Sequence, residues 1–166
     1  MNGSAPFRIG HGYDSHRFDP DRPLILGGVA IPGSPGLVGH SDADALLHAA
    51  IDALLGAAAL GDIGGHFPDS DPRWAGADSA ELLRAVVREV SAAGYEVGNL
   101  DATVVCERPR LSPYVAAIRS RMAGLLGIPV ERVSVKGKTN EGMDAVGEGL
   151  GIVVHCVVLL SARETA

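Results

Sequence analysis

Aromatic residues and excess positive charge are both scarce in this sequence. Only 4% of its 166 residues are aromatic, and acidic residues outnumber basic ones 20 to 14, for a net charge of -6. With so few aromatics the chain has no row of base-stacking platforms, and its core has to consist mainly of Ala, Val, Leu and Ile. The composition also argues against a nucleic-acid partner, because no basic excess exists to displace counterions from a phosphate backbone.

Long apolar runs and a disulfide framework are missing as well. No apolar segment reaches the ~20 residues that cross a bilayer, and residues 1–6 lack the basic and apolar regions of a signal peptide. The two cysteines, Cys106 and Cys156, lie in Val-rich segments and are expected to be buried free thiols. We therefore expect a cytoplasmic protein with no membrane partner.

The chain does contain enough apolar material for a single domain over residues 1–166. Hydrophobic residues make up 46% of it and charged residues 20%, and a domain of this size buries roughly two-thirds of its unfolded surface. Hydrophobic patterning and turn residues predict strands at 7–18, 24–31, 97–107, 130–136 and 151–160, and helices at 42–60, 78–94 and 112–127.

The order of these elements predicts an α/β (α+β) two-layer sandwich, in which helices cover one face of a mixed sheet. Segment 151–160 is apolar and β-branched on both of its faces, which is typical of a central strand. A sheet covered on one side needs a further layer on its second face, and a second copy of the chain supplies it most simply. We therefore expect an oligomer.

Asp14, His16 and His48 form the first candidate site. Residues two apart in a strand point to the same side, so Asp14 and His16 converge, and His48 shares one helical stripe with Asp44 and Asp52. Three such ligands with an open fourth position are typical of a catalytic zinc, with Asp44 or Asp52 accepting the second ring N–H of His48. The alternative is that both histidines are ordinary surface residues.

Two further polar segments are candidates for substrate binding. Loop 61–72 combines glycines, which allow close backbone approach, with carboxylates that can hold hydroxyl groups; a solvated acidic loop is the alternative. Lys138, Thr139 and Glu141 at a strand end suit a phosphate with Mg²⁺, although ordinary strand-end polarity explains them equally well. The segment is not a P-loop, because Arg132 occupies the position of the first glycine.

Taken together, these motifs resemble those of the 2-C-methyl-D-erythritol 2,4-cyclodiphosphate synthase family. The resemblance covers nearly the whole chain and consists of several independent motifs in the right order. They are Arg-Ile-Gly-His-Gly-Tyr-Asp-Ser-His at 8–16, Gly-His-Ser-Asp-Ala-Asp at 39–44 with His48, Ala-Ala-Ala-Leu-Gly-Asp-Ile-Gly at 57–64, and Phe-Pro-Asp-Ser-Asp-Pro at 67–72.

The resemblance implies roles for individual residues. Zn²⁺, or another divalent transition metal, would be held by Asp14, His16 and His48, and Glu141 would hold Mg²⁺ or Mn²⁺. His40 and Thr139 would be catalytic residues that act on the transition state. The residues implied to contact substrate are Asp14, His16, His40, Ser41, Asp62, Ile63, Gly64, Phe67, Asp69, Cys106, Arg110, Lys138, Thr139 and Glu141.

The resemblance also implies a reaction and an assembly. A phosphorus–oxygen lyase of the non-mevalonate isoprenoid pathway would convert 4-diphosphocytidyl-2-C-methyl-D-erythritol 2-phosphate to 2-C-methyl-D-erythritol 2,4-cyclodiphosphate and release CMP. Loop 62–71 would hold the methylerythritol part, and segments 106–112 and 138–141 the cytidine diphosphate part. The family is a homotrimer with a bacterial-chorismate-mutase-like fold and active sites between subunits.

The chain departs from the family pattern at three positions. Lys138 replaces a threonine, and Glu148 and Leu150 stand where the family has Arg and Glu near the three-fold axis. Converging carboxylates at the axis repel anions, so we expect its channel not to take an isoprenyl diphosphate. Two other functions are the alternatives: a zinc-dependent phosphohydrolase, in which the metal activates water, and a non-enzymatic trimeric binding module with structural zinc.

Overall fold

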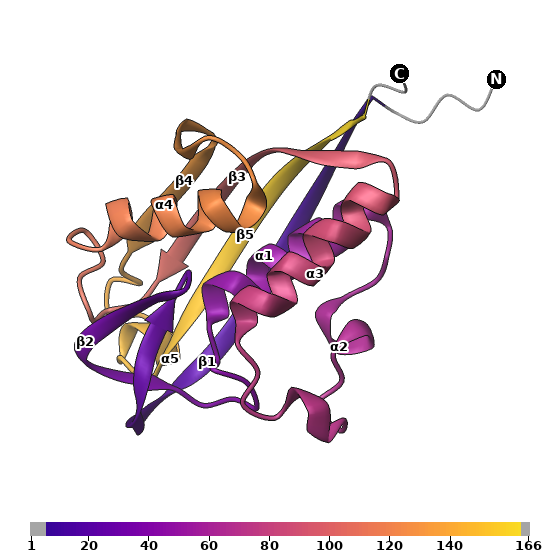
Figure 1. The fold of residues 1–166 in the computed structure, drawn as a ribbon. Helices are drawn as coiled ribbons and strands as arrows, with labels where there is room; N and C mark the ends of the chain where they lie inside the picture. Colours follow the sequence, from indigo (N-terminus) through magenta and orange to yellow (C-terminus); the bar gives the residue numbers. More distant parts are fainter. Residues whose placement is uncertain (1–5, 164–166) are drawn as a thin grey trace.

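The computed structural model describes residues 6–163, which contain one five-stranded sheet (Figure 1). Its strands are β1 (Phe7–Leu26), β2 (Val29–Leu37), β3 (Tyr95–Val105), β4 (Val133–Lys138) and β5 (Gly151–Ala162). They lie in the order β2-β1-β5-β3-β4. β3 and β4 run parallel, and every other neighbouring pair is antiparallel. A mixed sheet with the last strand at its centre is thereby confirmed.

Three helices, α1 (Ala45–Ala58), α3 (Ser79–Ala92) and α4 (Val115–Leu126), form a layer on one face of the sheet (Figure 1). The contact between β1 and α1 depends on glycine. A Cβ atom at Gly12 would lie 1.8 Å from the carbonyl oxygen of Ala49, and one at Gly10 would lie 1.9 Å from that of Ala53. The backbones of strand and helix therefore meet directly, and the predicted α+β arrangement is confirmed.

The opposite face of the sheet carries exposed apolar side chains. Phe7, Ile9 and Tyr13 of β1 are exposed, Ile9 to 73% of its surface, and so is Val157 of β5. Along β5, exposed positions alternate with buried ones such as Val158. The apolar composition of β5 indicates burial on both faces, but in the single chain Val157 and its neighbours on this face are not covered by any other part of residues 6–163.

The N-terminal hairpin differs from the prediction of separate strands at 7–18 and 24–31. β1 continues beyond the first segment to Leu26, and Gly27 and Gly28, with φ of +62° and +72°, make the turn into β2 inside the second segment. The Pro- and Gly-rich cluster 32–36, predicted as the turn that ends the second strand, lies inside β2. Proline is tolerated there because β2 is an edge strand of the sheet.

Short helical segments occupy the connections. The helix predicted at 42–60 is α1, and the connection 61–78 contains two helical turns. The strand predicted at 130–136 starts at Val133, because Arg119 donates to the carbonyl groups of Val130 and Val133 and so holds the preceding residues in a turn. The short segments are α2 (Ile63–His66), η1 (Pro72–Trp74), η2 (Val130–Arg132) and α5 (Asp144–Gly147).

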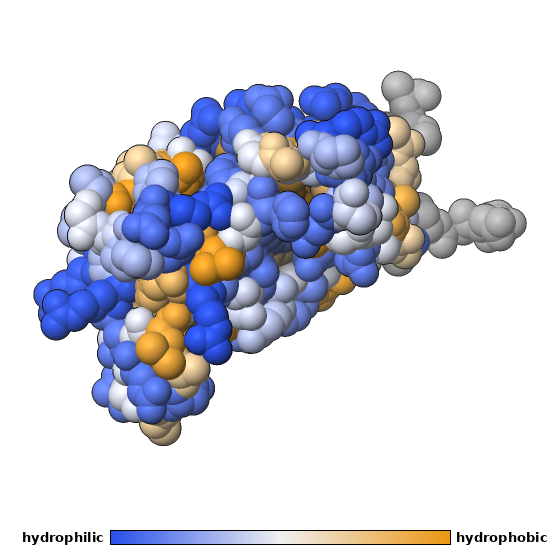
Figure 2. Space-filling view, turned by 90° about the horizontal axis from the view of Figure 1, so that it is seen from below, coloured by the Kyte–Doolittle hydropathy of each residue, from blue (hydrophilic) through white to orange (hydrophobic). Residues whose placement is uncertain are grey.

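The surface near α5 mixes polar and apolar residues. Viewed from below, hydrophobic patches emerge between hydrophilic ones (Figure 2). Met143 and Leu150, which flank α5, are exposed, and so is Glu148, which caps its C-terminal end. Within residues 6–163, no helix is long and apolar enough to cross a membrane.

Candidate active site

Asp14, His16 and His48 meet between β1 and the start of α1. The Asp14 Oδ2 atom lies 2.8 Å from His16 Nε2 and 3.1 Å from His48 Nδ1. One ligand atom from each of the three side chains lies within 4.8 Å of the other two. Asp14 and His16 project toward the helices because they share the strand face of Gly12, which touches α1.

The second nitrogen of each ring is also engaged. His16 Nδ1 lies 2.6 Å from the carbonyl oxygen of Val38, so this nitrogen carries the proton. His48 Nε2 lies 2.9 Å from the hydroxyl of Ser79 and 3.1 Å from that of Ser41. Each imidazole therefore turns its other nitrogen toward Asp14.

Ser79 determines the tautomer of His48. Its hydroxyl donates to Asp42 Oδ1, and its backbone N–H donates to Asp42 Oδ2. A hydroxyl has one proton to give, so the Ser79 oxygen accepts the Nε2–H of His48. The Nδ1 lone pair is then left facing Asp14 Oδ2. The chain Asp42–Ser79–His48 orients the ring as the hydrogen-bonded partners of metal-binding histidines do.

The prediction that Asp44 or Asp52 orients His48 is therefore wrong. Asp44 is fully buried, and its carboxylate accepts hydrogen bonds from the N–H groups of Gly27 and Gly28. These hydrogen bonds connect the β1–β2 turn to the start of α1. Burial raises the pKa of Asp44 to about 6, although these N–H groups act in the opposite direction. Asp52 accepts from the N–H of Ile63. Both carboxylates hold backbone rather than the imidazole.

The charge at the Asp14 group suits a divalent cation. Burial favours protonation of Asp14, but its interactions with His16 and His48, which are strongest when the rings are protonated, outweigh burial and lower the pKa of Asp14 to about 2. Burial by itself would lower the pKa of His16, whereas the hydrogen bond that the protonated ring makes with Asp14 raises it overall. An ionised carboxylate with two imidazoles held at fixed orientation is a donor set that fits Zn²⁺ or a related ion.

A pocket of about 270 Å³ opens beside the three ligands. Among the residues proposed from the sequence, Asp14, His16, His40, Ser41, His48, Ile63, Gly64, Phe67 and Asp69 line it. Asp62 is not among its lining residues, because its side chain caps α2 by accepting from the N–H of Gly65. Trp74, which sequence reasoning missed, packs edge-to-face against Phe67 with ring centroids 5.0 Å apart.

The other sequence-proposed residues gather at a second pocket, also of about 270 Å³. Cys106, Arg110, Lys138 and Thr139 line it. Thr139 Oγ1 donates to Glu141 Oε1 at 2.8 Å, which places Glu141 beside this pocket. The two pockets share no lining residue, so the single chain divides the proposed site into two parts.

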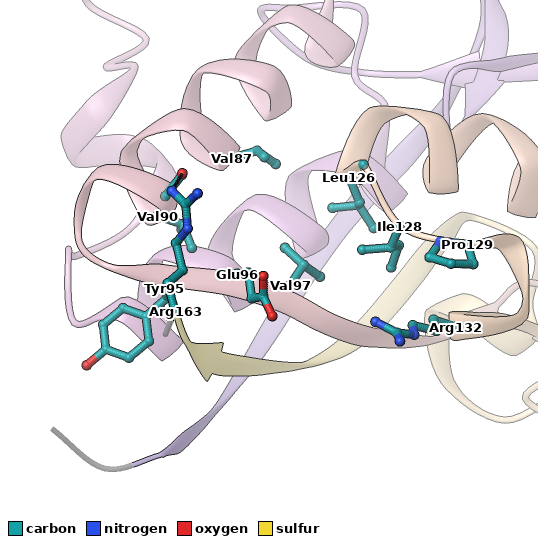
Figure 3. Close-up of a pocket in the computed structure, with 12 residues that line it drawn as sticks. Val87, Val90, Tyr95, Glu96, Val97, Leu126, Ile128, Pro129, Arg132 and Arg163 are labelled. Atoms are coloured by element: carbon teal, nitrogen blue, oxygen red, sulfur yellow. Dashed lines mark hydrogen bonds between the residues drawn. The ribbon is translucent and has the colours of Figure 1, made fainter. Parts of the chain in front are cut away.

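A third cavity, of about 270 Å³, lies between α3, α4 and β3 (Figure 3). Apolar side chains such as Val90, Val97 and Ile128 line it, together with Arg132 and Arg163. Arg163 donates to the hydroxyl of Ser91, a residue of α3. None of the residues proposed from the sequence lies in this cavity.

Comparison with known proteins yields a consistent family. The YgbB family model matches residues 7–161. The chain is 58% identical over 156 residues to a Cupriavidus metallidurans protein named 2-C-methyl-D-erythritol 2,4-cyclodiphosphate synthase. This alignment covers 94% of this chain and 93% of that protein. A CDP-bound structure of a synthase with the same name superimposes with a TM-score of 0.86 at 42% identity, over 93% of this chain and 100% of the other. The CDP complex of IspF from Plasmodium falciparum has a TM-score of 0.85 at 33% identity, over 98% and 100%.

Proposed function

This chain belongs to the YgbB family of 2-C-methyl-D-erythritol 2,4-cyclodiphosphate synthases, and on that premise we propose how its residues perform the reaction. The enzyme converts 4-diphosphocytidyl-2-C-methyl-D-erythritol 2-phosphate to 2-C-methyl-D-erythritol 2,4-cyclodiphosphate and releases CMP, in the non-mevalonate isoprenoid pathway. The main structural support for this function is the Asp14–His16–His48 group, which lies at the edge of a pocket lined by residues of the family motifs.

The reaction is an intramolecular phosphoryl transfer. An oxygen of the 2-phosphate attacks the β-phosphorus, the bond from that phosphorus to the bridging oxygen breaks, and CMP leaves with the bridging oxygen. The phosphate supplies its own lone pair, so no protein nucleophile is required. The protein has to fold a polyanion back on itself and align its two reacting groups.

Two cation sites meet this requirement. Asp14, His16 and His48 would hold Zn²⁺ or another divalent transition metal, and Glu141 would hold Mg²⁺ or Mn²⁺. When bound, these ions neutralise phosphate charge and align the attacking and leaving oxygens. The protein itself carries a net charge of -6 and so provides little general attraction for an anionic substrate.

The remaining residues position the substrate. His40, at the first pocket, supplies a hydrogen-bond donor to phosphate oxygens whose charge grows in the transition state, and so does Thr139, at the second pocket, once its hydroxyl turns from Glu141 to the substrate. The first pocket holds the methylerythritol part, with Asp69 accepting from its hydroxyl groups. The second pocket holds the cytidine diphosphate part, with Arg110 and Lys138 beside its phosphates.

The separation of the two pockets supports a shared site. Neither pocket has the full set of residues, so we propose that the first pocket of one subunit faces the second pocket of its neighbour. A closed three-fold ring joins one copy of each at every interface, and the apolar open face of the sheet gives the ring an inner surface to bury. The protein is accordingly proposed to be a homotrimer with a bacterial-chorismate-mutase-like fold, one domain per chain, acting in the cytoplasm.

The test is to incubate the protein with the cytidylated substrate while following CMP release and the phosphorus spectrum of the product. We expect a cyclic diphosphate. His48→Ala should abolish turnover without unfolding the chain, because a helix accepts alanine readily. Ser91→Ala, which alters a side chain of α3 that lines neither of the two pockets, should keep it. A linear phosphate product would instead identify a phosphohydrolase.

A further inference from the structure

A second group of imidazoles lies on the sheet face that the helices leave uncovered. His11 of β1 is paired with Val157 of β5, and His155 of β5 is paired with Tyr13 of β1, so the two histidines are diagonal neighbours. Both are exposed. Because Gly12 faces α1, His11 projects from the other side of the sheet. The pair is therefore on the opposite face from Asp14.

The two rings are arranged with their nitrogens facing each other. His11 Nε2 lies 3.2 Å from His155 Nδ1. The ring centroids are 5.5 Å apart with planes inclined by 30°. Tyr13 packs edge-on against His155 at 5.2 Å between centroids. Packing against Tyr13 limits the rotation of the His155 ring, so the nitrogen-to-nitrogen geometry is supported from one side.

This separation matches that of two ligands on one metal ion. A Zn–N bond is about 2.0–2.1 Å long, which puts two nitrogens at a tetrahedral angle ~3.3 Å apart. A carboxylate lies on the same face: Asp101 of β3 is paired with Val157. Its Oδ2 accepts from Lys136, whereas its Oδ1 is shielded from solvent and has no hydrogen-bond partner.

We propose that His11 and His155 bind a divalent transition-metal ion, separate from the one at Asp14. Imidazole nitrogen suits Zn²⁺, Cu²⁺ and Ni²⁺, and two protein ligands leave further positions for water. Both histidines belong to one chain, and they lie on the face of the sheet that the proposed trimer turns inward.

The test uses Zn²⁺ itself. The intact protein is dialysed to equilibrium against buffered Zn²⁺ over a wide concentration range, and bound zinc per chain is measured by elemental analysis. We expect a second, weaker ion after the Asp14 site has filled. His11→Gln and His155→Gln should each weaken that ion at least about tenfold, since each removes one of its ligands.

A matched control separates this site from general binding to histidine. His66, on α2, contacts the carbonyl oxygen of Leu60 and the carboxylate of Glu89, so His66→Gln removes one imidazole elsewhere and should leave the second ion in place. Retention of the second ion at unchanged affinity in both His11→Gln and His155→Gln would overturn the proposal. So would a wild-type protein that never takes up more than one ion.

Discussion

At the scale of single residues, the environment of His48 is the feature that most affects the metal site. The ring touches Asp14 on one side and Ser79 on the other, and Ser79 is itself fixed by Asp42. Together these contacts determine which nitrogen of His48 carries the proton. Metal affinity should therefore depend on a hydroxyl that does not contact the ion.

We expect Ser79→Ala to raise the dissociation constant of the metal by about 10- to 100-fold, the range typical of a lost partner behind a ligating histidine. The backbone N–H of Ser79 keeps its bond to Asp42 in this variant, so α3 still begins at the same residue. Competition with a chromophoric chelator measures the affinity. Ser91→Ala, which removes another hydroxyl from α3, is the control and should change nothing. Equal metal affinities in Ser79→Ala and Ser91→Ala would show that Ser79 does not support metal binding.

The two cysteines should be unreactive in the folded protein. Burial raises the pKa of Cys106 to about 11 and that of Cys156 to about 12, and both are free thiols, as the sequence predicts. Since the thiolate is the nucleophile, we expect no reaction with a disulfide reagent at pH 8 and two reactive thiols per chain in denaturant. Reaction of the native protein would contradict this, and Cys106→Ala would show which thiol is responsible.

At the scale of elements, the contact of β1 with α1 sets the position of the metal ligands. Asp14 and His16 follow Gly12 on the strand, and His48 precedes Ala49 on the helix. Separating the two backbones would therefore move the ligands apart. The same contact has no spare volume, because Gly12 already touches the carbonyl of Ala49.

Gly12→Ala should lower the free energy of unfolding by about 2–3 kcal/mol, since an added methyl meets backbone that cannot rotate away. The matched control is Gly56→Ala on the exposed side of α1, where a Cβ meets nothing within 4 Å. That change should raise the free energy of unfolding by about 0.5–1 kcal/mol through helix propensity. Urea unfolding of both variants measures the difference. A stability loss no larger for Gly12→Ala than for Gly56→Ala would contradict the close contact.

At the scale of the whole molecule, the question is how the two pockets combine. His48 belongs to the first pocket and Thr139 to the second. If each active site joins pockets from neighbouring subunits, two variants that are inactive alone complement each other when mixed. Variants of the same pocket do not.

We expect an equal, randomly assembled mixture of His48→Ala and Thr139→Ala chains to recover about one quarter of the wild-type activity. Each mixed trimer then has one interface in three with both native residues, and about one quarter of the trimers contain a single variant and stay inactive. Mixtures of His48→Ala with Asp14→Ala should stay inactive. The measurement is CMP release after mixing has been verified by native mass spectrometry. Verified mixed trimers without activity would show that each chain holds a complete site.

The sequence by itself determined the residues whose chemistry depends on local spacing. Asp14 and His16 converge because a strand repeats every two residues. The long run of Ala and Leu around His48 predicts its helix, and the family motifs identify the pocket residues. The central position of β5 was also predicted from its apolar, β-branched composition, which is typical of a strand with both faces buried.

Only the tertiary structure decided the contacts between distant segments. Ser79 lies 31 residues from His48, and no periodic pattern links them, so the sequence suggested the nearby Asp44 and Asp52 instead. The length of β1 depended on its pairing with an edge strand that tolerates proline. The division of the site into two pockets depended on where β1 and β4 lie in the sheet. Each of these outcomes is set by packing between segments far apart in the chain, which local spacing does not encode.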